Sequence, residues 1–369
     1  MAAIESPETV GLRPFHEFDD ANALWPRGGR PEAIRKAADE FRSRFKEQGE
    51  ITAVRTIPLV SAPYPVKYAF GGAAKAINPY VNIVNRLVVV QFEDFEGEMK
   101  TLVWEPTIPE GSADAPFYAQ LAAASPQWVQ DKLATEFNTL DQALASAGIA
   151  PEAVNFVSFD HLHVQDVRRL MGTTKPIDGE SEPKEAYFPN AKFLCQRLEV
   201  ATFENVHPMQ WAWYVPDGMT DVRDDNLVLL DGDVELGKGV AILWTPGHTD
   251  GNHSLVINTP EGIWVSSENG VCADSWQPHL SKIPGVKGFA EFMGREVVLN
   301  SNTLEDSVDQ YDSMVKEKSV ADSVASDPRW LQVFPSSEMA TLRRQWPVVP
   351  SYTHGGMNYG RIERRHARG

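Results

Sequence analysis

The chain has very few cysteines, and their rarity limits how the protein can be held together. Cys195 and Cys272 are the two cysteines among 369 residues, and they lie far apart in the sequence. Small secreted domains that depend on disulfides carry cysteine at a much higher density, so that class of protein is excluded. We interpret both residues as reduced thiols.

Long apolar runs are also missing. No segment approaches the roughly 18 apolar residues that a membrane-spanning helix needs. Residues 1–15 lack the basic start and the apolar stretch of a secretory leader. Because 42% of the residues are nevertheless hydrophobic, the chain can build a large core. We expect a cytoplasmic protein without membrane contact.

Positive charge is scarce as well. The chain has 34 basic against 51 acidic residues, which gives a net charge of -17. Such a field repels phosphate groups, so it argues against nucleic acid as a partner and against an anionic phosphate substrate. A small, neutral molecule fits better as the substrate.

The first fifty residues differ from the rest. They are polar, and residues 31–48 suit a helix that begins at Pro31. We expect residues 1–50 to form a partly helical N-terminal arm that packs on the body or on a partner subunit. Residues 51–369 are then a single domain, and a homo-oligomer remains open.

The body is rich in strand signals. Runs of β-branched and aromatic residues predict strands at 51–60, 65–70, 80–94, 98–106 and 154–159. A helix is predicted at 126–147, and a second β-rich stretch runs from 191 to 271. A helical segment at about 297–324 and a final strand at 347–354 follow. This order predicts an α/β (α+β) protein with two packed mixed sheets and helices outside.

Three histidines carry the strongest chemical signal. His161 and His163 follow a predicted strand and are one residue apart, so on an extended segment both side chains share a face. His248 lies in a turn between Gly247 and Gly251. Three imidazoles with an open fourth position form a known catalytic zinc site.

Four ordered motifs resemble the metallo-β-lactamase superfamily. Residues 139–166 are similar to its helix, turn and strand ending in the metal motif HxHxDH, and residues 245–255 to its second motif. Residues 262–271 resemble the strand before the bridging aspartate, and residues 347–356 the final strand with its terminal His354. The resemblance implies an αββα sandwich with a metal site at the edge between the sheets.

The departures from the family pattern concern the second metal. Gln165 and Asp166 stand where the family has Asp and His, and Asn269 stands at the bridging aspartate. The resemblance therefore implies an intact first site of His161, His163 and His248. We expect one zinc ion there and leave open a second ion at Asp166, Asn269 and His354, as well as manganese or iron.

The resemblance also suggests catalytic roles. Asp166 is the candidate general base or the group that orients the water, or else a carboxylate that fixes a histidine tautomer. His354 is a candidate to bind metal, to contact the nucleophile or to stabilise negative charge. Asp160 is expected behind the ligands. Glu268 and Asp274 are weaker candidates, which we interpret rather as residues of a solvated turn.

An unusually aromatic insertion at about 172–220 separates the first two motifs. We expect a substrate pocket lined by His207, Trp211, Trp213, Tyr214 and Trp276. The alternative is that these side chains only pack the insertion on the body. Chlorothalonil dehalogenase, in the same superfamily, also has Asn at the bridging position, so an activated aryl halide or aryl ether is a candidate substrate. Esters and lactones are equally open.

The sequence therefore favours a metal-dependent hydrolase that uses metal-activated water on a small, neutral, aromatic or ester-like molecule. Two other classes remain open. One is an iron-dependent oxidoreductase of the same fold. The other is a non-catalytic binding or scaffold protein with a vestigial metal site.

Overall fold

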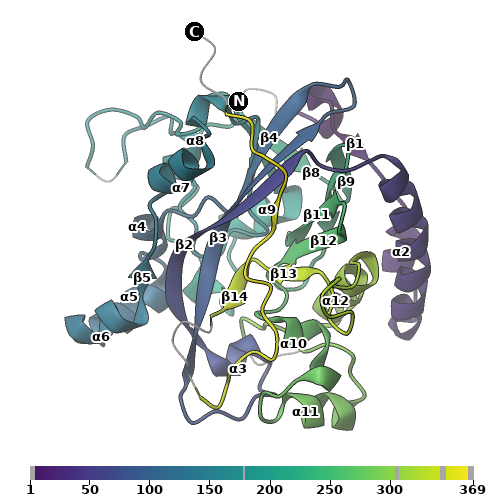
Figure 1. Ribbon diagram of the computed structural model, residues 1–369. Coiled ribbons are helices and arrows are strands. Elements are labelled where there is room, and N and C mark those ends of the chain that lie inside the picture. The colour runs from purple at the N-terminus through teal and green to yellow at the C-terminus, as the bar shows by residue number, and fades with distance from the viewer. Residues whose placement is uncertain (1–4, 178, 304–306, 341–345, 365–369) are drawn as a thin grey trace.

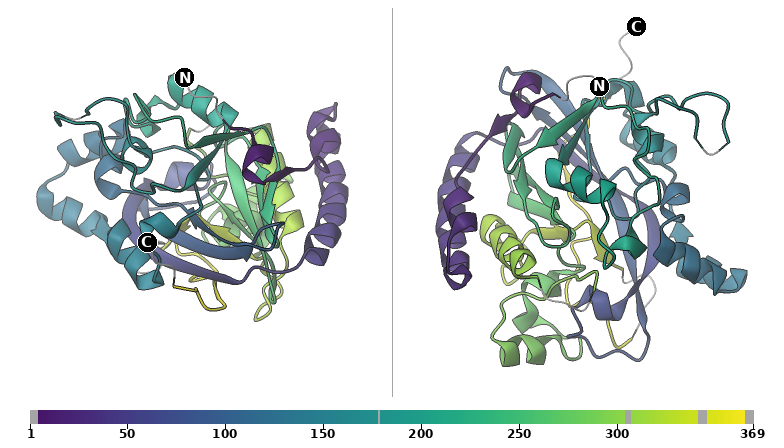
Figure 2. Two further views of the ribbon diagram at one scale, coloured as in Figure 1. Left: turned by 90° about the horizontal axis from the view of Figure 1, so that it is seen from above. Right: turned by 180° about the vertical axis from the view of Figure 1, so that it is seen from behind.

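Two mixed β-sheets pack face to face with helices on both outer surfaces (Figures 1 and 2). The structure is a computed structural model and describes residues 5–177, 179–303, 307–340 and 346–364. This layering is the αββα arrangement that the sequence predicts.

The larger sheet has the strand order β15-β2-β3-β4-β6-β7-β8. Strands β2, β3 and β4 are antiparallel, and β4, β6, β7 and β8 run parallel. Two short strands, β5 and β14, pair with β2 and β3. The bounds are β2 (Ala53–Pro65), β3 (Tyr80–Glu93), β4 (Met99–Trp104), β5 (Thr135–Glu136), β6 (Phe156–Ser158), β7 (Lys192–Gln196), β8 (Leu227–Leu230), β14 (Ser337–Met339) and β15 (Asn358–Tyr359).

The smaller sheet has the order β1-β9-β10-β11-β12-β13, and only its last pair is parallel. Its strands are β1 (Arg13–Pro14), β9 (Val234–Gly237), β10 (Val240–Trp244), β11 (His253–Thr259), β12 (Gly262–Ser267) and β13 (Val333–Pro335). The two sheets bury one shared core, to which Phe92 and Trp104 of the larger sheet and Ile242 and Leu255 of the smaller contribute. This burial is the main force that holds the sandwich together.

The N-terminal arm packs on the body. Helices α2 (Arg30–Glu47) and α12 (Val308–Val320) cover the outer face of the smaller sheet (Figures 1 and 2). Phe41 and Phe45 of α2 are fully buried in the same cluster as Met314 and Val265. Helix α7 (Leu140–Ala147) covers the larger sheet in the same way.

The remaining helices are short. They are α1 (Asp19–Ala23), α3 (Val66–Ala69), α4 (Pro109–Ser112), α5 (Pro116–Ala123), α6 (Gln127–Leu133), α8 (Arg168–Met171), α9 (Arg197–Glu204), α10 (Ala273–Trp276) and α11 (Val286–Met293), with 3-10 turns η1 (Pro7–Val10), η2 (Arg27–Gly29), η3 (Pro151–Ala153), η4 (Trp211–Trp213) and η5 (Pro278–Leu280).

Two sequence-based boundaries are wrong because local signals compete with periodicity. Residues 66–69, predicted as a strand, form helix α3. The predicted helix at 126–147 is two helices, α6 and α7, because Thr139 starts a new one. Its hydroxyl accepts from the N–H of Gln142, whose side chain accepts from the N–H of Thr139, and this reciprocal cap defines a helix start.

The aromatic insertion at about 172–220 contains β7, which falls within the predicted β-rich stretch 191–271 and joins the larger sheet. Two further expectations need correction. In the segment 297–324 only α12 is helical, and residues 304–306 lie outside the described residues. No strand occupies the described residues 346–354, where Pro347 and Pro350 lack the N–H that pairing requires; β15 follows instead.

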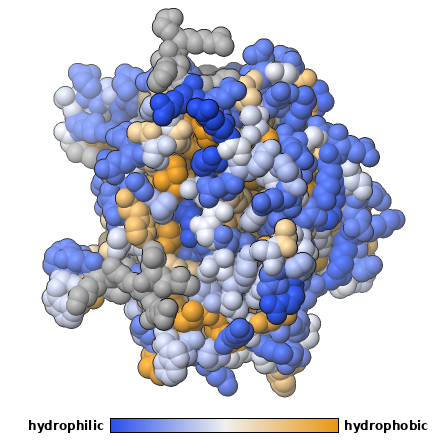
Figure 3. All heavy atoms as spheres, viewed as in Figure 1, coloured by the Kyte–Doolittle hydropathy of each residue, from blue (hydrophilic) through white to orange (hydrophobic). Residues whose placement is uncertain are grey.

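The visible surface is mainly polar. The face in Figure 3 is covered mainly by hydrophilic residues, with smaller hydrophobic patches among them. Within the described residues, no helix combines the length and the apolar character needed to cross a bilayer.

Candidate metal centre

Two loops, one from each sheet, bring three histidines together. His161 and His163 follow β6 of the larger sheet, and His248 lies between β10 and β11 of the smaller. One ligand atom from each ring lies within 4.8 Å of the other two. The ring centroids are 4.6 to 5.2 Å apart. The cluster therefore lies at the edge where the two sheets meet.

Hydrogen bonds leave one nitrogen of each ring available. His161 Nδ1 bonds to Asp160 Oδ1 at 2.5 Å, and His248 Nδ1 donates to the carbonyl oxygen of Asn300 at 2.9 Å. The Nε2 atoms of these two rings are then the free donors of electron pairs. His163 Nε2 is buried and has no hydrogen-bond partner among the described residues. A buried unpaired nitrogen is costly, so these donors fit a metal ion.

The electrostatics keep two of the rings, His163 and His248, neutral. Burial lowers the pKa of His163 well below its ordinary value, and the neighbouring His161 and His248 lower it further. Burial, and then the charge of His161, lower the pKa of His248 to about 3. Neutral imidazole is the form that binds a transition metal, so the site is ready for metal near neutral pH.

The loops that carry the histidines are tightly fixed. Val164 has a φ of 56°, which is strained for a β-branched residue, and its N–H donates to the carbonyl of Trp213 at 2.7 Å. Gly247 has a φ of 125°, and a Cβ there would lie 2.1 Å from the backbone nitrogen of Gln310. Only glycine fits beneath His248, where the loop meets the start of α12.

Asp166 does not join the cluster. Arg168 donates from Nε and from a terminal nitrogen to the two carboxylate oxygens of Asp166, each at 2.8 Å. Its side chain is buried against α4, since a Cβ on Gly111 would lie 2.8 Å from Asp166 Cβ. Asp166 is thus a structural ion-pair partner, and its predicted role as base or ligand needs correction.

The other predicted residues of the second metal also lie elsewhere. Asn269 donates to Glu317 at 2.7 Å, and the ring of His354 packs edge-on against Trp264 and Tyr352. Neither belongs to the metal-binding group or to the wall of the adjoining cavity. His354 lies away from the three histidines because the predicted final strand that would carry it does not form. Gln165 lines the cavity and donates to Thr107 at 3.1 Å.

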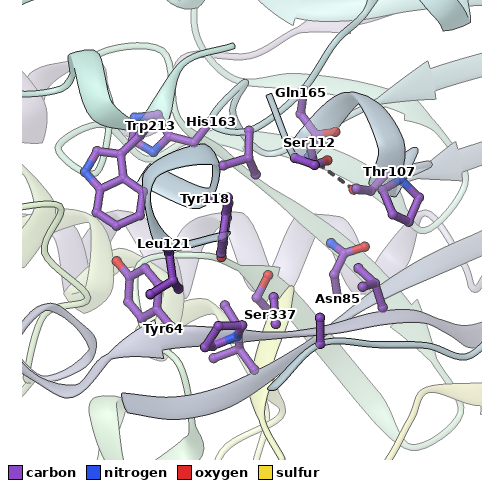
Figure 4. Close-up of a pocket in the computed structure, with 18 of the residues that line it drawn as sticks. Tyr64, Asn85, Thr107, Ser112, Tyr118, Leu121, His163, Gln165, Trp213 and Ser337 are labelled. Carbon is purple, nitrogen blue, oxygen red and sulfur yellow. Dashed lines mark hydrogen bonds between the residues drawn. The ribbon is translucent and has the colours of Figure 1, made fainter. Parts of the chain in front are cut away.

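A cavity of about 310 Å3 adjoins the three histidines. Its walls come from β2, β3 and the helices α4 and α5. Figure 4 shows Tyr64, Tyr118, Leu121 and His163 among the side chains that line the cavity. Apolar side chains dominate the lining away from the histidines: Val60, Ala62, Pro63, Ile83, Pro109, Ala113, Leu121, Ala122 and Ala134.

The structure separates the aromatic residues predicted for a substrate pocket. Trp213 lines the cavity, and Tyr214 packs behind His163 with ring centroids 4.7 Å apart. His207 and Trp211 are exposed to solvent. Trp276 is buried and donates from its indole nitrogen to Glu317 at 2.8 Å. Among these five residues, only Trp213 contacts the cavity.

Two carboxyl groups line the cavity wall, of which sequence reasoning missed Glu105 and treated Glu268 only as a weaker candidate. Glu105 follows β4 with a φ of 59°, and its Oε1 accepts from the N–H of Asp160 at 2.7 Å. Glu268 accepts from the N–H of Ser337 at 3.0 Å and from Asn300 Nδ2 at 3.2 Å. Burial, and then the charge of Asp160, raise the pKa of both. The position of Glu105 at the end of the predicted strand 98–106 was the available signal.

Glu268 and Asp274, the acidic residues that we interpreted as part of a solvated turn, are buried. Glu268 lies in the cavity wall, and Asp274 accepts from the N–H of Ser351 at 2.9 Å. Asp160 lies behind His161, one of the three candidate ligands, as the sequence analysis expects. Although burial opposes its ionisation, the adjacent His161 lowers the pKa of Asp160, so it serves as the anionic partner of that ring.

No protein-family model matches the chain. Among solved structures, it is similar to a dizinc quorum-quenching lactonase in complex with a product, at 10% identity and a TM-score of 0.48 over 85% of this chain and 95% of that one. It is similar to a quorum-quenching N-acyl homoserine lactone lactonase at 16% identity and a TM-score of 0.43, over 67% and 89%. It is also similar to a probable metal-dependent hydrolase from Staphylococcus aureus at 15% identity and a TM-score of 0.42, over 60% and 74%. Similarities of this size do not bear on what this chain binds or converts.

Proposed function

We propose that this protein is a metal-dependent hydrolase of the metallo-β-lactamase superfamily. The observation that carries the proposal is the convergence of His161, His163 and His248, with two rings oriented by oxygen acceptors and the third holding an unpaired buried nitrogen. The sequence motifs of these loops support the same conclusion. We expect one ion, zinc by preference, because the predicted second ligand set is not assembled.

The reaction follows from the donor set. His161, His163 and His248 would hold the ion, and a zinc ion bound by three neutral imidazoles would make water acidic enough, with a pKa of about 7, to supply hydroxide at neutral pH. Asp160 and the carbonyl of Asn300 hold two of the rings in the required tautomer. In place of Asp166, the carboxyl groups of Glu105 and Glu268 line the cavity and are placed to exchange a proton with a bound substrate.

The cavity supports a neutral substrate with an apolar part. One end presents the three imidazoles, Glu105 and Glu268, and the rest is mainly apolar. Carboxyl groups in the wall and a net charge of -17 both disfavour an anionic substrate. Esters and lactones with an apolar tail fit this description, and so do activated aryl halides and aryl ethers.

We also propose that the protein is cytoplasmic, and the free, buried cysteines Cys195 and Cys272 are consistent with a reducing compartment.

The test is hydrolysis by the purified full chain. Activity is measured on p-nitrophenyl esters, acyl-substituted γ-lactones and activated aryl chlorides, before and after removal of metal with dipicolinate. We expect turnover of at least one class, its loss on chelation and its recovery with zinc. His248→Ala is the control that should not recover. Full turnover in metal-free protein would refute the proposal.

Two measurements separate the alternatives. An iron-dependent oxidoreductase would contain iron by elemental analysis and would require oxygen, so an anaerobic assay distinguishes it from a hydrolase. A protein that binds no metal and converts none of these compounds would instead be a binding or scaffold protein.

A further inference from the structure

Glu199 lies outside every motif that the sequence suggests, yet its carboxylate accepts hydrogen bonds from several parts of the site. It is in the first turn of α9 and only 1% exposed. The carboxylate accepts three hydrogen bonds, from the N–H of Leu162 at 2.8 Å, the hydroxyl of Tyr214 at 3.0 Å and the hydroxyl of Thr249 at 2.5 Å.

The three donors come from three parts of the metal centre. Leu162 lies between His161 and His163, whereas Thr249 directly follows His248. Tyr214 packs its ring against His163 at an interplanar angle of 78°. A single carboxylate therefore joins the loop from the larger sheet, the loop from the smaller sheet and the ring behind one ligand.

The packing around this carboxylate leaves little freedom. A Cβ on Gly251 would lie 2.2 Å from the backbone nitrogen of Glu199, so the loop of His248 rests directly on the start of α9. The backbone N–H of Leu162 can only donate, and the carboxylate supplies acceptors on both oxygens. An amide would keep one oxygen acceptor for Leu162 and Tyr214, but it would lose the negative charge and would present an N–H2 donor to Thr249, whose hydroxyl would then have to accept instead of donate.

We infer that Glu199 is a positioning residue that sets the spacing of the three imidazoles for the metal ion. It acts through the two loops and Tyr214, because its side chain does not line the substrate cavity. This role rests on the proposed metal-dependent function. It predicts that removing the carboxylate lowers the affinity for the metal ion itself, whatever its effect on the rate of hydrolysis.

The experiment measures metal binding by the full chain. Zinc affinity of Glu199→Gln is determined by competition with a chromophoric chelator, and the visible absorption of the Co2+-substituted protein reports the ligand geometry. We expect zinc binding to weaken by roughly 10- to 100-fold, the range typical for groups that orient metal ligands, with a changed cobalt spectrum.

Glu235→Gln is the matched control. Glu235 is also a buried carboxylate, on β9, and it accepts from Gln48 and pairs with Arg44 away from the histidines. We expect Glu235→Gln to lower the melting temperature while leaving zinc affinity and the cobalt spectrum unchanged. A loss of affinity that merely followed the loss of stability would appear in both variants and would overturn the inference.

A second pair of variants covers the case in which Glu199→Gln does not fold. Thr249→Val removes one donor to the carboxylate, and Thr249→Ser keeps it. We expect weaker zinc binding in the first and recovery in the second. Equal zinc affinity in Thr249→Val and the unaltered protein would then refute the role of Glu199. If the unaltered protein itself binds no zinc, the proposed function fails as well, whereas normal binding in Glu199→Gln refutes only the positioning role.

Discussion

Single residues with the same chemistry play different parts here because their surroundings differ. Asp166 and Glu268 are both buried carboxyl groups near the metal loops. Asp166 is neutralised by two hydrogen bonds from Arg168, whereas Glu268 lies in the cavity wall and is held by Ser337 and Asn300. A buried ion pair mainly contributes to structure, while a carboxyl group in a cavity can act on a ligand.

The first prediction contrasts these two residues. We expect Glu268→Gln to lower turnover by roughly 100-fold or more, the usual contribution of a proton-transfer group, while zinc affinity stays the same. Asp166→Asn should lower the free energy of unfolding by about 3 kcal/mol, because it removes the carboxylate that pairs with the buried guanidinium of Arg168, and should keep turnover per folded molecule. Steady-state kinetics and urea titration measure both. Equal turnover losses in the two variants would contradict this assignment.

The second prediction concerns His354 and pH. Burial, and then the positive charge of Arg86, lower the pKa of His354 to about 4 in the folded protein. In the unfolded chain the ring titrates near its ordinary pKa of about 6.5. The unfolded state therefore binds more protons between these values, so the stability that His354 contributes is present above about pH 6.5 and is lost as the pH falls toward 4.

The variant that tests this is His354→Phe, which keeps an aromatic ring beside Trp264 and Tyr352. Between pH 7 and pH 5 the unaltered protein should lose about 2 kcal/mol more stability than the variant. Urea unfolding at the two pH values gives the difference. Identical pH dependence, or a loss of zinc affinity in the variant, would be evidence against the present placement of His354.

At the scale of elements, short helices between the strands shape the site together with the sheets. The sheets supply the strand ends that carry the histidines, as in any sandwich built on this plan. Helices α4 and α5, between β4 and β5, supply the apolar wall through Ala113, Leu121 and Ala122. These helices have no strong sequence pattern, so their contribution to specificity is visible only in the folded protein.

The third prediction addresses that wall. Leu121→Asp places a charge against the apolar part of a bound substrate, so KM should rise by roughly tenfold for substrates with long apolar tails. The rise should be small for acetate esters, and kcat should change little. Ala119→Asp, on the same helix but exposed and outside the cavity lining, is the control and should match the unaltered protein. A uniform rise in KM for all tail lengths would place the substrate elsewhere.

At the scale of the whole molecule, the N-terminal arm packs closely on the domain. Phe18, Phe41 and Phe45 are fully buried with the outer face of the smaller sheet. Arg42 donates to the carbonyls of Val320 and Ala321 at the end of α12. Helix α2 therefore covers α12, and α12 in turn packs beneath the loop of His248, so the arm supports the metal centre indirectly.

The fourth prediction tests this coupling. Phe41→Ala should lower the free energy of unfolding by about 3 to 5 kcal/mol and keep a single cooperative transition, because the arm unfolds with the body. Lys36→Ala, on the exposed face of the same helix, should change stability by less than about 0.5 kcal/mol. Urea unfolding followed by circular dichroism and tryptophan fluorescence measures both. An early, separate transition of the arm would show that it is an independent unit.

The sequence by itself determined the layered architecture and the three histidines. Strand and helix patterns are local, and His161, His163 and His248 follow strand ends within short motifs, so their meeting needs only the common plan of the fold. Tertiary structure alone decided the rest. Whether Asp166 faces a metal or Arg168, where His354 lies, and which carboxyl groups reach the cavity depend on contacts between residues far apart in the chain. Glu199 accepts hydrogen bonds from residues 162, 214 and 249. The spacing of these residues along the sequence does not predict that they meet.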